Sequence, residues 1–231
     1  EADELCVQLV IKKKVFACIS DDMDMFVYKC PRVIRHFNIK HDSFVLYDLK
    51  DILNALDISF ENFKWLLACS LMYFSSCFGQ TFFISLYANE IRSFFQLSHG
   101  DWGSIYALGT LASAFMMLVL GGLVDKYEFK KLLILVFISL SILCFTMVLN
   151  SSLWILIGII FGLRFFGQGM LFHLPSVAIG RWFGQNKGKA TSIAVLGFSL
   201  GEAIFPIIMT FIISFVGWKF SWSFGGVLLL L

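Results

Sequence analysis

Charge is scarce over most of this chain, and proline is scarce throughout, with 3 residues in 231. The cysteines show no CxxC or other metal-ligand spacing, and their apolar surroundings favour reduced thiols over disulfides. They are Cys6, Cys18, Cys30, Cys69, Cys77 and Cys144. No secretory signal pattern is present. The chain starts without Met and stops within an apolar run, so we expect both ends to continue in a longer protein.

Hydrophobic residues make up 58% of the chain and its mean hydropathy is +0.82, whereas soluble domains are usually about 45–50% apolar. This composition excludes an ordinary cytosolic enzyme and a disordered regulator. The net charge of +2 conceals an uneven distribution, because residues 1–64 carry 20 charged side chains and residues 65–231 carry only 14. We therefore expect two chemically different domains with these boundaries.

Long uncharged runs fill the second domain, for example from Trp65 to Asn89. Since about 20 apolar residues cross a bilayer as a helix, several runs are long enough to be membrane spans. The sequence predicts spans at about 65–88, 103–124, 131–149, 153–178 and 189–216, with 218–231 as the start of a sixth. The expected fold is mainly α, a multi-span helical bundle that is an integral membrane protein. A soluble protein would need several buried uncharged helices in a short chain.

Basic residues are concentrated in two short loops, which are expected to face the cytoplasm. They are Lys126, Lys130 and Lys131 after the second span, and Arg181, Lys187 and Lys189 after the fourth. Ser98 and Asp101 resemble a helix capping box before the second span. The glycine pairs Gly158/Gly162 and Gly197/Gly201 favour close helix contact, with a hinge or pathway role as the alternative. Pro206 favours that alternative because it breaks a backbone hydrogen bond in the fifth span.

Three ionisable residues lie in or near apolar spans, where a charge is costly and usually faces a partner or a water-filled cavity. Glu202 is a candidate for substrate binding or proton coupling, or else a structural partner of Arg164. His173 is either a titrating pathway residue or a packing residue near the membrane surface. Gln80 and Gln168 could line a pathway or form hydrogen bonds between helices.

The second domain resembles the major facilitator superfamily. The stretch GGLVDKYEFKKLL matches its loop signature at Gly121, Asp125, Lys126, Lys130 and Lys131, while Glu128 stands where the family usually has Gly. LRFFGQGM is similar to a second motif of the family, with Arg164, Gln168 and Gly169 in place. The region from Gly180 to Pro206 is similar to monocarboxylate-type members.

This resemblance implies one half of a secondary active transporter for a small metabolite, with an anion favoured, and with protons as a candidate coupling ion. The implied partners are the lipid bilayer, the substrate and a missing C-terminal six-helix half, and no cofactor is implied. The loop carboxylate would bias which side of the carrier is open. A carrier half is not expected to alternate access by itself.

The first domain has the pattern of a small α/β segment. An amphipathic helix begins near Ala2, strands are expected at 15–20, 32–37 and 43–47, and Asp48 begins another helix with its own cap. The acidic pairs Glu1/Asp3 and Asp22/Asp24 could hold Mg²⁺, with helix caps and solvated acids as the alternative.

Residues 1–37 resemble the internal core of flap endonucleases without a gap, and residues 47–63 resemble the stretch that follows. This resemblance implies that Glu1, Asp3, Asp22 and Asp24 are part of a Mg²⁺ site. The family's Gly-x-Asp-Tyr segment is replaced by Lys64-Trp65-Leu66-Leu67, so the ligand set is incomplete and no nuclease activity is expected. DNA would be a partner only of a complete nuclease.

The two resemblances do not make one functional protein, so we expect a chimeric sequence joined near Phe63–Trp65. The favoured function is that of a transporter fragment joined to a nuclease remnant. The alternatives are a fragment of a Mg²⁺-dependent, structure-specific 5′ nuclease acting on DNA, and a membrane anchor without transport activity.

Overall fold

The computed structural model describes residues 2–38, 43–56 and 59–230. By its contacts the chain divides into two compact units, Glu1–Leu67 and Ala68–Leu231. The division falls within helix α3 (Phe60–Ser75), which starts in the first unit and continues in the second. Each unit is described separately below.

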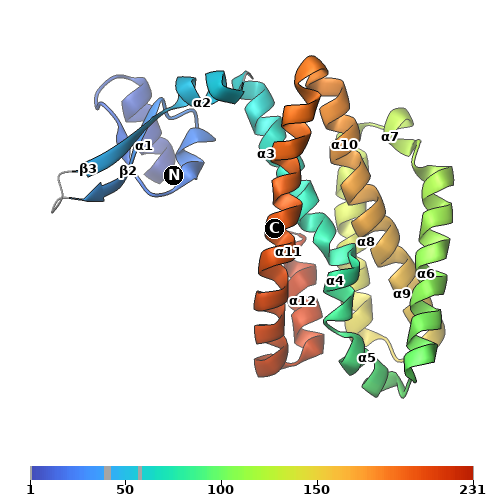
Figure 1. Cartoon of the computed structure of the whole chain (residues 1–231). Coiled ribbons are helices and arrows are strands. Elements are labelled where there is room, and N and C mark those ends of the chain that lie inside the picture. Colours follow the sequence, from blue (N-terminus) through green and yellow to red (C-terminus); the bar gives the residue numbers. More distant parts are fainter. Residues whose placement is uncertain (1, 39–42, 57–58, 231) are drawn as a thin grey trace. The chain divides into compact units, whose positions relative to one another are not determined.

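The first unit combines short helices with a small sheet (Figure 1). In chain order its elements are α1 (Ala2–Ile11), β1 (Cys18–Ile19), the 3₁₀ helix η1 (Met23–Phe26), β2 (Arg32–Asn38), β3 (Ser43–Asp48) and α2 (Leu49–Leu56). The strand order is β1-β2-β3, with β1 parallel and β3 antiparallel to β2. The first strand has only 2 residues, so it is shorter than the strand that the apolar run 15–20 predicts.

Apolar side chains from both helices and the sheet form the core of this unit. Val7 on α1, Phe26 on η1 and Val33 on β2 are almost completely buried. The predicted cap before α2 is confirmed, because the Lys50 amide donates a hydrogen bond to Asp48 Oδ1 at 2.9 Å. The core is small, and several apolar side chains of the sheet remain exposed, Phe44 among them.

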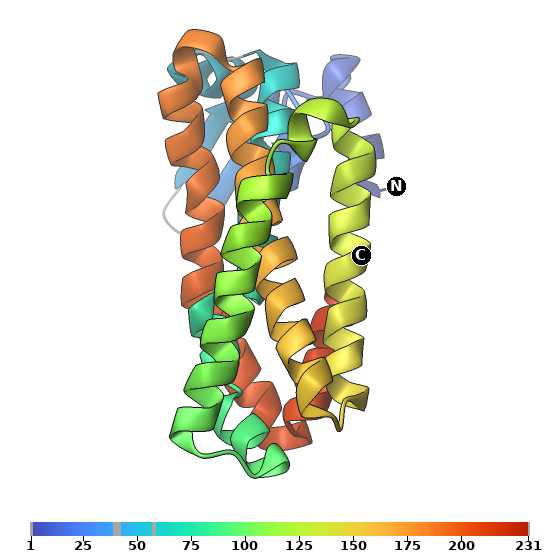
Figure 2. The ribbon, with the colours of Figure 1, turned by 90° about the vertical axis from the view of Figure 1, so that its right-hand side faces the viewer.

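The second unit is a bundle of long helices (Figures 1 and 2). Its elements are η2 (Ser76–Gly79), α4 (Thr81–Ser85), α5 (Ala88–Phe95), α6 (His99–Leu120), α7 (Leu123–Lys126), α8 (Phe129–Leu149), α9 (Leu153–Gly162), the π-helix η3 (Leu163–Met170), α10 (Leu171–Trp182), η4 (Gly184–Asn186), α11 (Lys187–Val216) and α12 (Trp218–Leu228). Figure 2 shows α6, α8 and α11 running along one common direction.

Among the described residues, 5 helical stretches are long and apolar enough to cross a membrane. They are Phe60–Ser85, His99–Lys126, Phe129–Leu149, Leu153–Trp182 and Gly184–Val216. Together with the small sheet of the first unit, they confirm the predicted fold class.

The first of these stretches is not one regular helix. Its α-helical turns stop at Ser75, a 3₁₀ turn follows, and Gln80 adopts an extended conformation with φ −82° and ψ 155° before α4 begins. The predicted span at about 65–88 thus corresponds to a stretch that a 3₁₀ turn and the extended Gln80 interrupt. The cause lies in packing against η3 and cannot be read from hydropathy.

The capping box before the second span is confirmed. Ser98 Oγ accepts a hydrogen bond from the Asp101 amide at 3.1 Å, and Asp101 Oδ2 accepts one from the Ser98 amide at 3.0 Å. This reciprocal pair satisfies two amides that a helix start would otherwise leave without acceptors.

The predicted close contact at the glycine pairs is confirmed at three of the four positions. A Cβ atom placed on Gly197 would lie 2.0 Å from the Ser70 carbonyl oxygen, and one on Gly201 would lie 2.5 Å from Cys77 Sγ. At Gly162 it would lie 2.6 Å from a methyl carbon of Leu143. The prediction is wrong for Gly158, where a Cβ atom would have no atom of another helix within 4 Å.

Candidate functional site

An ion pair links the loop after α6 to the end of α10. Asp125 lies on the short helix α7, and its Oδ1 accepts a hydrogen bond from Arg181 Nη2. Arg181 Nη1 also donates to the Val124 carbonyl oxygen at 3.4 Å. Both side chains are partly exposed, so the pair contributes about 0.2–1 kcal/mol on its own. A contact of this size can be broken and remade during a conformational change.

The rest of the loop signature surrounds this ion pair in the chain. The Gly121 amide donates to the Met117 carbonyl oxygen at 2.8 Å and ends α6. Glu128 has φ −61°, so the turn needs no left-handed residue and tolerates the replacement of the family's Gly. Its carboxylate pairs with Lys131 at 2.9 Å. Lys126 and Lys130 are exposed to solvent.

A buried guanidinium lies inside the second unit. Arg164 is 8% exposed and belongs to the π-helix η3. Its Nη1 donates to the Gly79 carbonyl oxygen at 3.2 Å and to Thr81 Oγ1 at 3.1 Å. The guanidinium also lies 5.5 Å from the centre of the Tyr106 ring, and the Tyr106 hydroxyl donates to Thr81 Oγ1 at 2.9 Å. Within the described chain Arg164 Nε is buried and has no hydrogen-bond partner.

The break in the first span and the π-helix touch through their backbones. A Cβ on Gly79 would lie 2.2 Å from the Leu163 carbonyl oxygen, and one on Gly167 would lie 2.6 Å from Gly79 Cα. Gln168 contributes its backbone to the same contact, and its side chain is half-buried. Gly169 packs on α6, since a Cβ there would lie 2.8 Å from Met117 Sδ.

The remaining pathway candidates are spread over the bundle. Gln80 is almost buried at the break in the first span, and His173 is half-buried on α10. Glu202 is exposed on α11, and the described residues contain no ion pair between it and Arg164. Pro206 lacks an amide hydrogen, so the Glu202 carbonyl has no donor four residues later. The structure therefore gives Arg164 other partners than Glu202.

The acidic residues of the first unit that the structure describes are exposed or cap helices. Glu1 lies outside the described residues, and Asp3 on α1 is exposed. Asp22 caps η1, with its Oδ1 accepting a hydrogen bond from the Asp24 amide at 3.0 Å. No group of three or more His, Cys, Asp or Glu side chains that could hold a metal ion occurs in the described part of the chain.

Sequence reasoning missed two members of the Arg164 cluster, Thr81 and Tyr106. Both are polar groups within otherwise apolar spans, and that was the available signal. The sequence gives no signal for the pairing of Arg181 with Asp125, because the charge pattern places Arg181 only in a basic loop.

A bundle in which 5 of the described helical stretches are long and apolar enough to cross a membrane is typical of an integral membrane protein. Residues 69–231 match the model of the Major Facilitator Superfamily, and the chain belongs to this superfamily. Residues 1–72 match the XPG I-region, so the two matches overlap at 69–72.

Flap endonucleases are curated relatives of the N-terminal part. Flap endonuclease 1 of Saccharomyces cerevisiae (strain YJM789) is 35% identical over 66 residues, which are 27% of this chain and 17% of that protein. Flap endonuclease 1 of Zea mays is 32% identical over 83 residues, which are 34% of this chain and 22% of that protein. The chain thus spans less than a quarter of the length of these relatives. No solved structure matches it.

The comparisons confirm both resemblances, a facilitator carrier and a flap-endonuclease core. Similarity to flap endonucleases is consistent with a divalent metal in the nuclease-like part, although the described residues show no metal site.

Proposed function

We propose that the second unit acts in secondary active transport of a small anionic metabolite, with protons as a candidate coupling ion. Membership of the Major Facilitator Superfamily supports transport as the activity. The buried Arg164 supports an anionic substrate, because a cation in an apolar bundle attracts a negative charge and its Nε–H is available as a donor. Glu202 and His173 are proposed as the groups that exchange protons.

The ion pair between Asp125 and Arg181 carries the proposed mechanism. It connects two helices that are distant in sequence, and it is weak enough to break when the carrier changes the side to which it opens. The loop lysines are proposed to stabilise the same state by holding the loop at the cytoplasmic surface. In this orientation both basic loops face the cytoplasm.

The test measures uptake of a panel of labelled carboxylates. It uses cells that express the open reading frame containing this chain, or proteoliposomes that contain its protein product. Asp125→Asn should lower the uptake rate several-fold, and the charge exchange Asp125→Arg/Arg181→Asp should recover part of it. Glu128→Gln is the control, because it removes an exposed carboxylate of the same loop that pairs only locally. Uptake that is unchanged in Asp125→Asn would remove the ion pair from the mechanism.

Proton coupling has a separate test. Glu202→Gln should abolish the pH dependence of uptake, while substrate binding remains. A pH profile that is the same in wild type and variant would exclude Glu202 from coupling.

The first unit is proposed to have no nuclease activity of its own. Asp22 accepts a hydrogen bond from the Asp24 amide, and among the described residues no cluster of acidic side chains comes together that could hold two metal ions. The full chain, incubated with Mg²⁺ and a 5′-flap DNA, should leave the DNA intact. Cleavage that is lost in Asp22→Ala would show that the unit is an active nuclease.

We also propose that the two parts are chimeric, joined near Phe63–Trp65. The two family matches meet within a few residues of this position, and they belong to unrelated activities. Amplification across the junction from source DNA should give no product. A reproducible product would show that the junction is natural.

A further inference from the structure

A cleft with a strongly basic lining lies within the first unit. It encloses about 900 Å³ and is formed by the end of α1 with the loop that follows it, the starts of β2 and α2, and the first residue of α3. The cations that line it are Lys13, Lys14, Lys29, Arg32 and Lys50. Asp48 is the one carboxylate among the described lining residues, and it lies 3.5 Å from Arg32 Nε. The cleft therefore has an excess of positive charge.

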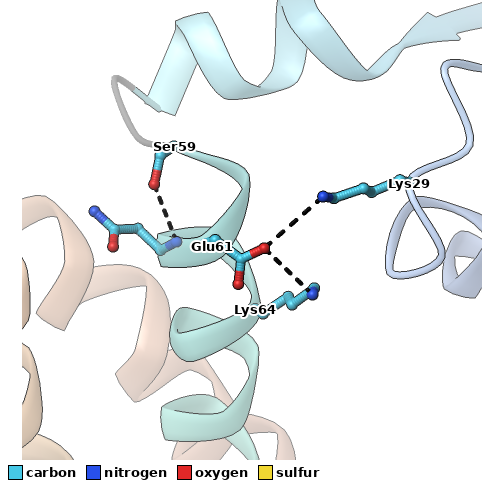
Figure 3. A network of polar contacts seen from close by, with 5 residues as sticks. Lys29, Ser59, Glu61 and Lys64 are labelled. Carbon is cyan, nitrogen blue, oxygen red and sulfur yellow. Dashed lines mark hydrogen bonds and ion pairs between the residues drawn. The ribbon is translucent and has the colours of Figure 1, made fainter.

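The carboxylate next to the cleft does not neutralise this excess. Glu61 Oε1 lies 3.8 Å from Lys29 Nζ and 3.5 Å from Lys64 Nζ, so one negative charge is shared by two ammonium groups (Figure 3). Both ammonium groups also lie over the Phe60 ring, at 4.7 and 5.0 Å from its centre.

The walls of the cleft are apolar and partly open to solvent. Phe16 is 62% exposed, and Val15 and Ile11 on the same side are exposed as well. The Arg32 guanidinium lies 4.5 Å from the centre of the Phe16 ring. A ligand that complements this surface has an anionic head for the cations and a hydrocarbon part for the exposed walls.

One residue of the cleft belongs to a helix that is long and apolar enough to cross a membrane. Phe60 is the first residue of α3, and the Ser59 hydroxyl caps this helix by accepting the Asn62 amide at 3.2 Å (Figure 3). The stretch Phe60–Ser85 is long and apolar enough to cross a membrane. The chain that carries the basic cleft thus also carries a candidate membrane span, and clusters of Lys and Arg on membrane proteins are typical binding sites for anionic lipid.

We propose that this cleft binds the headgroup of an anionic phospholipid, with the acyl chains lying along the wall formed by Ile11, Val15 and Phe16. DNA would also match the charge, but it would leave this apolar wall in water. Phospholipid satisfies both the cations and the wall.

The experiment is native mass spectrometry of the full chain in detergent, with equal amounts of phosphatidylserine and phosphatidylcholine added. The test variant is Lys14→Gln/Lys29→Gln. The matched control is Lys12→Gln/Lys64→Gln, which also removes one lysine of the 12–14 tract and one ammonium partner of Glu61, but neither of its residues lines the cleft. Circular dichroism checks that both variants keep the wild-type helix content.

Wild type and control should retain phosphatidylserine in preference to phosphatidylcholine. The test variant should bind phosphatidylserine about 20- to 30-fold more weakly, since each basic side chain near an anionic lipid surface contributes about fivefold. Equal loss in test and control variants would show a general charge effect and overturn the proposal. Equal retention of both lipids by the wild type would overturn it as well. So would tight binding of a labelled 5′-flap DNA that phosphatidylserine fails to displace.

Discussion

Replacing Gly197 by Ala should destabilise the bundle more than replacing any exposed glycine. Gly197 on α11 is buried, and the added Cβ would lie 2.0 Å from the Ser70 carbonyl oxygen and 2.8 Å from the Ser70 carbonyl carbon. The obstacle is backbone and cannot rotate away, so α11 and α3 must separate by more than an ångström. Overpacking of this kind costs about 1–3 kcal/mol or more, and the better helix propensity of Ala returns about 1 kcal/mol. Because the obstacle is backbone, the cost lies at about the upper end of this range, which leaves a net loss of roughly 2 kcal/mol.

Gly158 provides the matched control, because it lies in a glycine pair with the same spacing and has no atom within 4 Å of its added Cβ. Gly158→Ala should leave stability unchanged or raise it by up to about 1 kcal/mol through helix propensity. The assay is thermal unfolding of the detergent-purified chain, followed by helix content and by the reactivity of buried thiols. If Gly197→Ala and Gly158→Ala unfold at the same temperature, the contact between α11 and α3 is not as close as described, and the reasoning fails.

Three further predictions concern single side chains. Arg164→Lys keeps the charge but loses the planar donor group, so it should lower the uptake rate at least tenfold, whereas uptake at wild-type rate would assign the role to charge alone. Burial raises the pKa of the Cys18 thiol to about 12, and the neighbouring Cys30 adds to this shift. At pH 8 maleimide should therefore modify the exposed Cys6 before Cys18. Equal modification rates of the two thiols in a mass-spectrometric time course would contradict this. Asp101→Ala removes the capping box and should lower the free energy of unfolding by about 1 kcal/mol, measured by thermal unfolding against a neutral surface variant.

Much of the membrane fold could be predicted from sequence because lipid imposes a simple rule. Uncharged runs of sufficient length must be helices, so the five long stretches and the capping box at Ser98 follow from composition and spacing alone. In the first unit the start of α2 could also be predicted, because Asp48 carries a local capping signal.

The irregular parts could not be predicted, because they depend on tertiary contacts. Gln80 is extended and residues 163–170 form a π-helix because the two segments meet backbone to backbone at Gly79 and Gly167. Neither segment carries a local pattern for these conformations. The partner of Arg164 was equally hidden, since its guanidinium binds a backbone carbonyl exposed by the break in the first span.

The contact between Gly79 and Gly167 has a consequence for how such a carrier can diversify. It is made by main-chain atoms, so it does not depend on the chemistry of any side chain nearby. Gln80 and Gln168, which are proposed to line the pathway, can therefore change while the joint between the two helices stays the same. Selection for a new substrate therefore acts on the side chains of these few residues. Selection for a stable fold acts on their main-chain atoms.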